Sequence, residues 1–167
     1  MKIVKFSVFS GLLIALLLGV TGGGGGGGGT TPAAPTRATL KLSINNLPVG
    51  IKAATLSVNF ILPTGVVPIP LAGNDASGAI AFSGNNINVQ NSLSAASYIA
   101  ATGVVTIGAV SLNGLVGGEY MTLNCAINPG TTVSGSSFPA TATFVSASDT
   151  SSVAIVGLTI PIAVTLQ

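Results

Sequence analysis

The sequence predicts an all-β domain, an antiparallel β-sandwich, on the strength of three observations. Apolar and polar residues alternate with a period of two along several segments, which is typical of strands with one buried face. Turn-forming clusters of Gly, Pro, Asn and Asp separate these segments at spacings of about 8–15 residues. No window after residue 36 shows a helical apolar stripe with charged residues opposite it. We therefore expect about eight or nine short strands in a sandwich.

The expected strands follow the alternation along the chain. Regular alternation predicts strands at residues 40–44, 54–62, 121–127, 138–144 and 158–166. Less regular strands are expected at residues 79–83, 87–90, 97–101 and 104–112. Turn signals lie at residues 46–50, 63–65, 73–75, 84–86, 113–114 and 128–130. Pro161 has no N–H to donate to a sheet, so the last strand is expected at a sheet edge or bulged at that residue.

The N-terminal part predicts an export signal at residues 1–21. Lys2 and Lys5 form a positive start, and residues 11–20 form an apolar run shorter than the roughly 20 residues of a membrane span. This signal helix is either a signal peptide removed on export or an N-terminal anchor that is kept, and it is the only segment expected to touch a membrane. Residues 22–36 follow as a flexible, disordered linker, with glycine from Gly22 to Gly29 and then Thr, Pro and Ala. The folded domain is expected to span residues 37–167.

Charge excludes one class of partner. After residue 21 the chain keeps three basic and three acidic residues, so its net charge is zero. Nucleic-acid binding requires a basic patch, and the sequence therefore excludes it. A near-neutral surface wetted by Ser, Thr and Asn favours self-association.

The residue types argue against catalysis. The chain has no histidine, which removes the commonest general base and zinc ligand. The acidic residues Asp75, Glu119 and Asp149 lie far apart in sequence, whereas a glycosidase needs two carboxyl groups across one sugar ring, so we expect solvated loop charges. Residues 74–78 offer one carboxylate, and a calcium loop clusters several. We expect no catalytic residue, no bound metal and no cofactor.

Cysteine and the aromatic residues are expected to serve mainly the core. Cys125, the one cysteine, cannot form an internal disulfide and is expected to be buried, a reactive thiol or an intermolecular disulfide being the alternative. The chain has no tryptophan, so stacking on sugar rings would rest on Tyr98 and Tyr120, with Tyr120 expected on the polar face of its strand. These two are the candidate ligand-binding residues, and a place at the margin of the sandwich is their alternative. The phenylalanines expected in the core are Phe60, Phe82, Phe138 and Phe144.

Three segments together resemble the cohesin-like modules of exported bacterial proteins: residues 56–66, 117–127 and 138–144. The resemblance covers nearly the whole folded part. It implies a nine-stranded sandwich of the jelly-roll type, related to carbohydrate-binding modules, with its first and last strands adjacent. It also implies binding of a protein such as a dockerin through one sheet face. The chain is also similar to glycine-tethered surface lipoproteins, although it has Thr21 where those proteins carry a cysteine.

The sequence thus predicts an exported, non-enzymatic binding or adhesion module, extracellular or on the bacterial cell surface. Its expected partner is a protein, dockerin-like or from the cell envelope, or a polysaccharide. One alternative is a structural subunit that assembles with itself into a matrix or fibre through an edge strand. Another is a glycoside hydrolase, which would require Asp75, Glu119 or Asp149 to converge in one cleft. The partner's identity, the sheet face used, the fate of residues 1–21 and the oligomeric state are left open.

Overall fold

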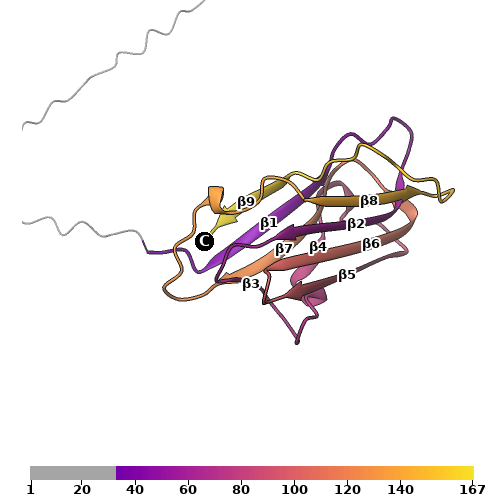
Figure 1. The fold of residues 1–167 in the computed structure, drawn as a ribbon. Coiled ribbons are helices and arrows are strands. Elements are labelled where there is room, and N and C mark those ends of the chain that lie inside the picture. Colours follow the sequence, from indigo (N-terminus) through magenta and orange to yellow (C-terminus); the bar gives the residue numbers. More distant parts are fainter. Residues whose placement is uncertain (1–32) are drawn as a thin grey trace, which may run out of the picture. The chain divides into compact units, whose positions relative to one another are not determined.

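Nine β-strands, all paired antiparallel, form two sheets in the computed structural model, which describes residues 33–167 (Figure 1). The predicted all-β sandwich is therefore confirmed. Residues 33–167 make one compact unit, with β1 beginning at Arg37. The predicted signal segment at residues 1–21, and the predicted linker up to residue 32, lie outside the described residues.

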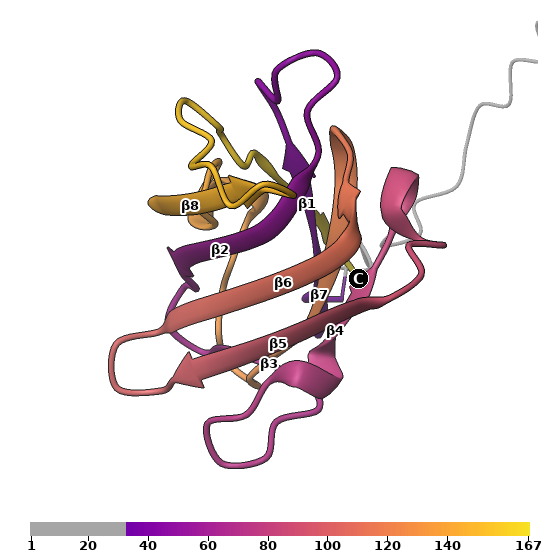
Figure 2. The same cartoon turned by 90° about the vertical axis from the view of Figure 1, so that its right-hand side faces the viewer.

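The five-stranded sheet has the order β3–β7–β1–β9, and β4 pairs with β7 as well. The four-stranded sheet has the order β5–β6–β2–β8, and Figure 2 shows these four strands side by side. The strands of the first sheet are β1 (Arg37–Ile44), β3 (Val66–Pro68), β4 (Ile80–Phe82), β7 (Gly118–Ile127) and β9 (Ile162–Leu166). Those of the second are β2 (Ala53–Ile61), β5 (Ser92–Ile99), β6 (Val104–Leu115) and β8 (Phe144–Asp149). Short 3₁₀ turns lie at η1 (Ser77–Ala79), η2 (Gly84–Asn86) and η3 (Gly135–Ser137).

The core lies between the two sheets and contains the apolar residues of the regular alternations. In β1 every second side chain from Ala38 to Ile44 is buried, and the intervening ones face solvent at least in part. The same holds for β2 from Leu56 to Phe60 and for β7 from Met121 to Ile127. These three predicted alternations are confirmed, because period two places residues of one parity on one side of a sheet.

A bulge in β7 overturns the prediction that Tyr120 faces solvent. Leu42 of β1 pairs with Met121, but the next residue, Ser43, pairs with Glu119, so Tyr120 is an extra residue in β7. A bulge puts two successive side chains on nearly the same side of the strand. Tyr120 therefore points inward beside Met121, and both are fully buried.

A second irregularity shifts the start of β2. Ala53 pairs with Asp149 of β8, whereas Thr55 pairs with Ser148, which leaves Ala54 without an opposite residue. The sequence predicted Ala54 on the buried face, but it is Ala53 that is fully buried, and Ala54 is half-buried.

The strand predicted at residues 138–144 is wrong except for its last residue, because the chain crosses between sheets there, and β8, over residues 144–149, was not predicted. The strand predicted at residues 158–166 is confirmed only in its last part, as β9. Residues 138–143 are not a strand; backbone hydrogen bonds tie Ala142 N–H to Ile160 O (2.9 Å) and Ile162 N–H to Ala140 O (2.8 Å). Thr143 N–H then bonds to Asn59 O (2.8 Å), and β8 begins at the next residue in the other sheet. The last strand begins only after Pro161 and lies at the edge of its sheet, as the missing N–H of proline predicts.

The less regular predictions are confirmed only in part. Strands do form near residues 79–83, 97–101 and 104–112, as β4, β5 and β6, although β5 begins earlier, at Ser92. Residues 87–90 form no strand, and the turn predicted at residues 113–114 lies inside the longer β6. The short β3 was not predicted.

A buried amide fastens η2 to the hairpin of β6 and β7. The Asn86 side chain is fully buried; its Nδ2 donates to Val116 O (3.1 Å) and Glu119 O (3.3 Å), and its Oδ1 accepts from Val116 N–H (2.9 Å). A polar side chain with this many partners in the interior acts as a fixed clamp, because each partner would otherwise be left unpaired.

We expect Asn86→Ala to lower the free energy of unfolding by about 2–4 kcal/mol, since it leaves buried backbone groups of Val116 and Glu119 without partners. Urea denaturation measures the change. Asn88→Ala is the matched control, because Asn88 is exposed, and it should change the free energy by no more than about 0.5 kcal/mol. Equal effects of the two substitutions would contradict the clamp.

Candidate functional site

The outer faces of the two sheets differ in charge. The outer face of the five-stranded sheet carries Arg37, Lys41 and Glu119, and Lys41 Nζ lies 3.3 Å from a carboxylate oxygen of Glu119. Ser83 approaches that carboxylate, and together with Lys41 it holds the pKa of Glu119 below its ordinary value. The strands of the four-stranded sheet place no ionisable side chain on its outer face among the described residues, and the charge beside this face is Asp75, on the loop next to β5. We call this outer face the neutral face.

The strand register arranges the neutral face in four rows across the sheet. The central rows are polar or small apart from Phe144: one joins Ser97, Thr106, Asn59 and Phe144, and the next joins Ala95, Gly108, Ser57 and Ser146. Rows at the two ends are more apolar: one joins Leu93, Val110, Thr55 and Ser148, and the other joins Ile99, Val104 and Ile61. The hydroxyls of Thr55 and Ser148 lie 2.7 Å apart, which places both on this outer face.

One corner of the neutral face is an exposed apolar cluster. Leu93 of β5 is 78% exposed, Leu112 of β6 is 75% exposed, and Val110, the cross-strand partner of Leu93, is 50% exposed. Leu93 lines two shallow hollows, and no charged residue lines either of them. We call Leu93, Val110 and Leu112 the apolar corner. Large apolar side chains gathered in one place on a surface mark a contact site more often than single ones do.

A groove crosses the polar rows of the neutral face beside β5. It measures about 480 Å³, its floor includes Ala95 and Gly108, and residues 74–77 form its wall. Those residues add to the edge of β5, because Ala76 N–H donates to Ala96 O and Tyr98 N–H donates to Asn74 O, both at 2.9 Å. The loop thus covers the edge of β5 from Ala96 to Tyr98.

Asp75 is the one carboxylate that borders this groove. Its Oδ1 accepts a hydrogen bond from Ser77 N–H (2.8 Å), and hydrogen bonding to Ser77 lowers the pKa of the carboxyl, so it is ionised at neutral pH. Gly108, on the floor, has no atom within 4 Å of the position that a Cβ would take. The groove is therefore open above the glycine.

The structure places neither candidate tyrosine at the surface. Tyr98 is 5% exposed and donates its hydroxyl to Val66 O (3.3 Å), and Tyr120 is fully buried. Burial raises the pKa of both phenols. Neither ring offers a face on which a sugar could stack, and in the case of Tyr120 the bulge in β7 is the reason.

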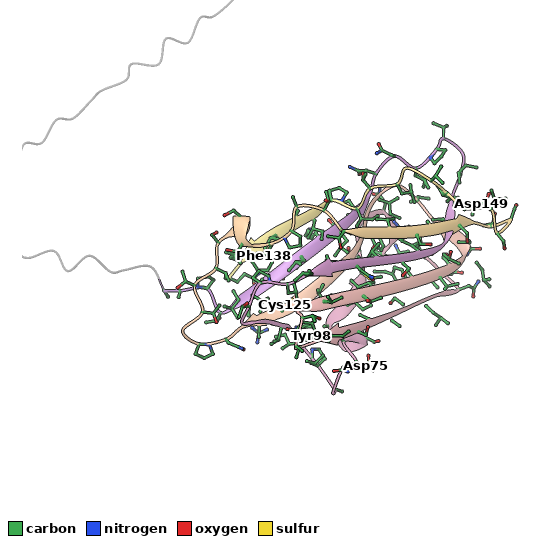
Figure 3. All side chains as sticks on the ribbon, in the orientation of Figure 1. Asp75, Tyr98, Cys125, Phe138 and Asp149 are labelled. Carbon is green, nitrogen blue, oxygen red and sulfur yellow. The ribbon has the colours of Figure 1, made fainter. Side chains whose placement is uncertain are left out.

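The other residues expected in the core are mostly found there. Cys125 is 1% exposed, Phe60 is fully buried and Phe138 is 6% exposed, and Figure 3 labels Tyr98, Cys125 and Phe138. Phe82 is half-buried and packs against this core. Phe144 begins β8, and nothing is described of its side chain.

The structure does not bring the three side-chain carboxylates together. Asp75 lies on the loop before η1, Glu119 lies on β7, and Asp149 ends β8, where its Oδ1 accepts from Ser151 N–H (2.8 Å) and Val153 N–H (2.9 Å). Figure 3 shows Asp149 at the right-hand end of the domain and Asp75 at its lower edge, well apart from each other. Within residues 33–167 no group of three or more potential ligands from His, Cys, Asp or Glu could hold a metal ion.

The described residues were also compared with the requirements of a membrane span, and the chain was compared with known proteins. None of the helical turns in residues 33–167 has the length and apolar character that crossing a membrane would require. Neither a protein-family model, nor a curated protein, nor a solved structure matches this chain.

Sequence reasoning missed the apolar corner. A signal was present, since Leu93 and Ile99 share the parity of the outward residues of β5, whereas Ala96 and Tyr98 share the buried parity. The strand was expected only from residue 97, so Leu93 was not placed on any face. The pairing of Leu93 with Val110 depends on the β5–β6 register, which the sequence does not display.

Removing the hydroxyl group should affect stability differently at the two tyrosines. Tyr98→Phe removes a hydrogen bond and should lower the free energy of unfolding by about 1 kcal/mol. Tyr120→Phe removes a buried hydroxyl that has no partner within residues 33–167, so stability should stay the same or rise by up to about 1 kcal/mol. Urea denaturation compares the two. A larger loss for Tyr120→Phe than for Tyr98→Phe would mean that the Tyr120 hydroxyl has a partner.

Cys125 should be unreactive while the domain is folded. Burial raises the pKa of its thiol to about 12, so the thiol stays protonated at pH 8 and the reactive thiolate is absent. We expect a chromogenic disulfide reagent to titrate no thiol in the native chain and one thiol in concentrated guanidinium. Raising the pH above the pKa of an unfolded thiol, about 8.5, should destabilise the fold, because only the unfolded chain can then lose the proton. Rapid labelling of the native chain at pH 8 would contradict the buried placement.

Proposed function

We propose that this chain is an exported, non-enzymatic binding or adhesion module that engages a protein or polysaccharide partner through the neutral face. The observation that carries the proposal is the contrast between the two outer faces. The outer face of the five-stranded sheet carries charged side chains on its strands. The strands of the other sheet place none on the neutral face, with Asp75 beside them on the groove wall, and the exposed apolar corner lies at one end of this face.

Desolvation favours the neutral face as the contact surface. Removing water from a charged side chain costs much more than removing it from a hydroxyl or a methyl group. The central rows offer small and hydroxyl-bearing side chains, such as Ser57, Gly108 and Thr106, and the apolar corner adds Leu93 and Leu112. The centre of an interface is depleted in charged residues, and the strand residues of the neutral face share that property.

The cohesin-like identity is part of the same proposal. Two features of the structure support it: the domain has nine strands, and its first strand, β1, pairs with its last, β9. A jelly-roll-type connection of the two sheets and a partner of the dockerin kind belong to this proposal. The export of the chain, and its presentation on a glycine-rich linker, rest on the sequence.

Self-assembly through an edge strand is the second candidate, and one observation favours it. β9 is an edge strand, and within residues 33–167 its outer backbone edge pairs only at Ile162, with Ala140. An unpaired edge accepts a strand from another molecule. The hydrolase alternative has no comparable support, since the three carboxylates lie on separate elements.

A charge placed on the neutral face tests the proposal. The immobilised full chain is exposed to a cell-envelope extract and to a polysaccharide array, beside Leu93→Asp and the matched control Thr165→Asp. Leu93 and Thr165 are both exposed on strands, but Thr165 lies on the other sheet. We expect the wild type and Thr165→Asp to retain the same partner, and Leu93→Asp to retain roughly tenfold less, because an apolar contact is replaced by a charge that must lose its water.

Equal retention by Leu93→Asp and the wild type would argue against the neutral face. No retained partner, together with concentration-dependent oligomers in gel filtration, would favour self-assembly. Those oligomers should then persist in Leu93→Asp, because the edge of β9 is unchanged.

A further inference from the structure

A second hollow, separate from the neutral face, is rich in amide side chains. It measures about 310 Å³ and lies where the β1–β2 connection, η2 with the residues after it, and the end of β6 meet. Its polar lining consists of Lys52, Asn85, Asn86, Asn88, Gln90 and Asn113. The proposed partner contact on the neutral face uses none of these residues.

The frame of the hollow is fixed by buried contacts. Asn86, fully buried, clamps η2 to the β6–β7 hairpin, and Asn85 Nδ2 donates to Gly117 O (2.8 Å). Gly114 has a φ of +72°, and a Cβ on it would overlap the Cβ of Lys52, so glycine lets the β1–β2 connection approach β6. The backbone of Lys52 thereby lies close to β6, and its exposed side chain lines the hollow. A site with a fixed frame loses little entropy when it binds.

Several polar groups of the lining are available for a ligand. Asn113 Nδ2 is used internally, donating to Gln90 O (3.3 Å). Within residues 33–167 the Asn88 amide, the Gln90 side-chain amide and Lys52 Nζ have no hydrogen-bond partner. An amide group has both donors and an acceptor, and an ammonium group has only donors. The available set therefore matches a ligand that has many hydroxyls and one negative charge.

The charges around the hollow also favour a ligand with one negative charge. No carboxylate lines the hollow, and the nearby Glu119, whose backbone oxygen accepts from Asn86, has its carboxylate paired with Lys41. Lys52 is thus a positive charge with no opposing charge in the lining. An anion that reaches Lys52 would form a charge-assisted bond, which is stronger than a bond between neutral groups.

We propose that this hollow binds a uronic acid residue of an acidic saccharide. Lys52 Nζ pairs with the sugar carboxylate, and the amides of Asn88 and Gln90 exchange hydrogen bonds with ring hydroxyls, each of which is both donor and acceptor. The volume, about 310 Å³, suits a sugar unit and is far larger than a simple carboxylate ion requires.

A titration with defined saccharides tests the site on the full chain. The probe is trigalacturonate; maltotriose provides the neutral control and acetate the control for a carboxylate without hydroxyls. The variants are Lys52→Gln, Asn88→Ala and Lys41→Gln, the last a matched lysine on the other sheet that is paired with Glu119. Isothermal titration measures affinity, and thermal unfolding checks that each variant is folded.

We expect the wild type and Lys41→Gln to bind trigalacturonate equally, and Lys52→Gln to bind it roughly tenfold or more weakly. Asn88→Ala should weaken binding less, and added salt should weaken it in the wild type. Equal affinity for maltotriose, equal affinity for acetate, no binding by the wild type, or no effect of Lys52→Gln would each overturn the proposal. None of these outcomes depends on the partner of the neutral face, because Leu93 and Val110 are unchanged in every variant.

Discussion

Apolar contact between the two inner sheet faces holds this domain together, since little else is available to do so. The one cysteine is unpaired and buried, and Lys41–Glu119 is the one ion pair within residues 33–167. An exposed pair of this kind adds little to stability. Leu40, Phe60 and Leu123 are among the fully buried side chains on which the remaining elements depend. Strand register follows, because a slip by one residue would turn each apolar face outward.

The alternation of residues was sufficient to predict the class of fold and the course of β1, β2 and β7. The alternation failed where pairing with a strand distant in sequence changes which side chains face inward. Tyr120 is turned inward by a bulge that exists only in the pairing of β7 with β1, so no inspection of β7 alone could place it. The apolar residues of 138–144 hold even positions, whereas the apolar residues Val145 and Ala147 of β8 hold odd positions, and the chain changes sheets at Thr143. Periodicity records which side of a strand is buried, but not which sheet buries it.

The candidate surface was accessible to sequence reasoning only as a composition. Abundant Ser, Thr and Asn predicted an uncharged face, but its position required the register of four strands. The amide-rich hollow was still less accessible, because Lys52, Asn88 and Asn113 come from three separate stretches of the chain. What joins them is the Asn86 clamp together with the close approach of Gly114 to Lys52, and neither is a local property.

The pairing of β1 with β9 has a mechanical consequence. Thr36 and Arg37 both donate their N–H groups to Gln167 O, at 2.7 and 3.0 Å, so the two ends of the described chain lie side by side. A force that pulls these ends apart would break the hydrogen bonds between β1 and β9 one after another, and each step would require only a small force. A force applied between Arg37 and the far sheet would instead have to move two packed layers past each other at once. The force needed to unfold the domain would therefore depend on the two points between which the force is applied.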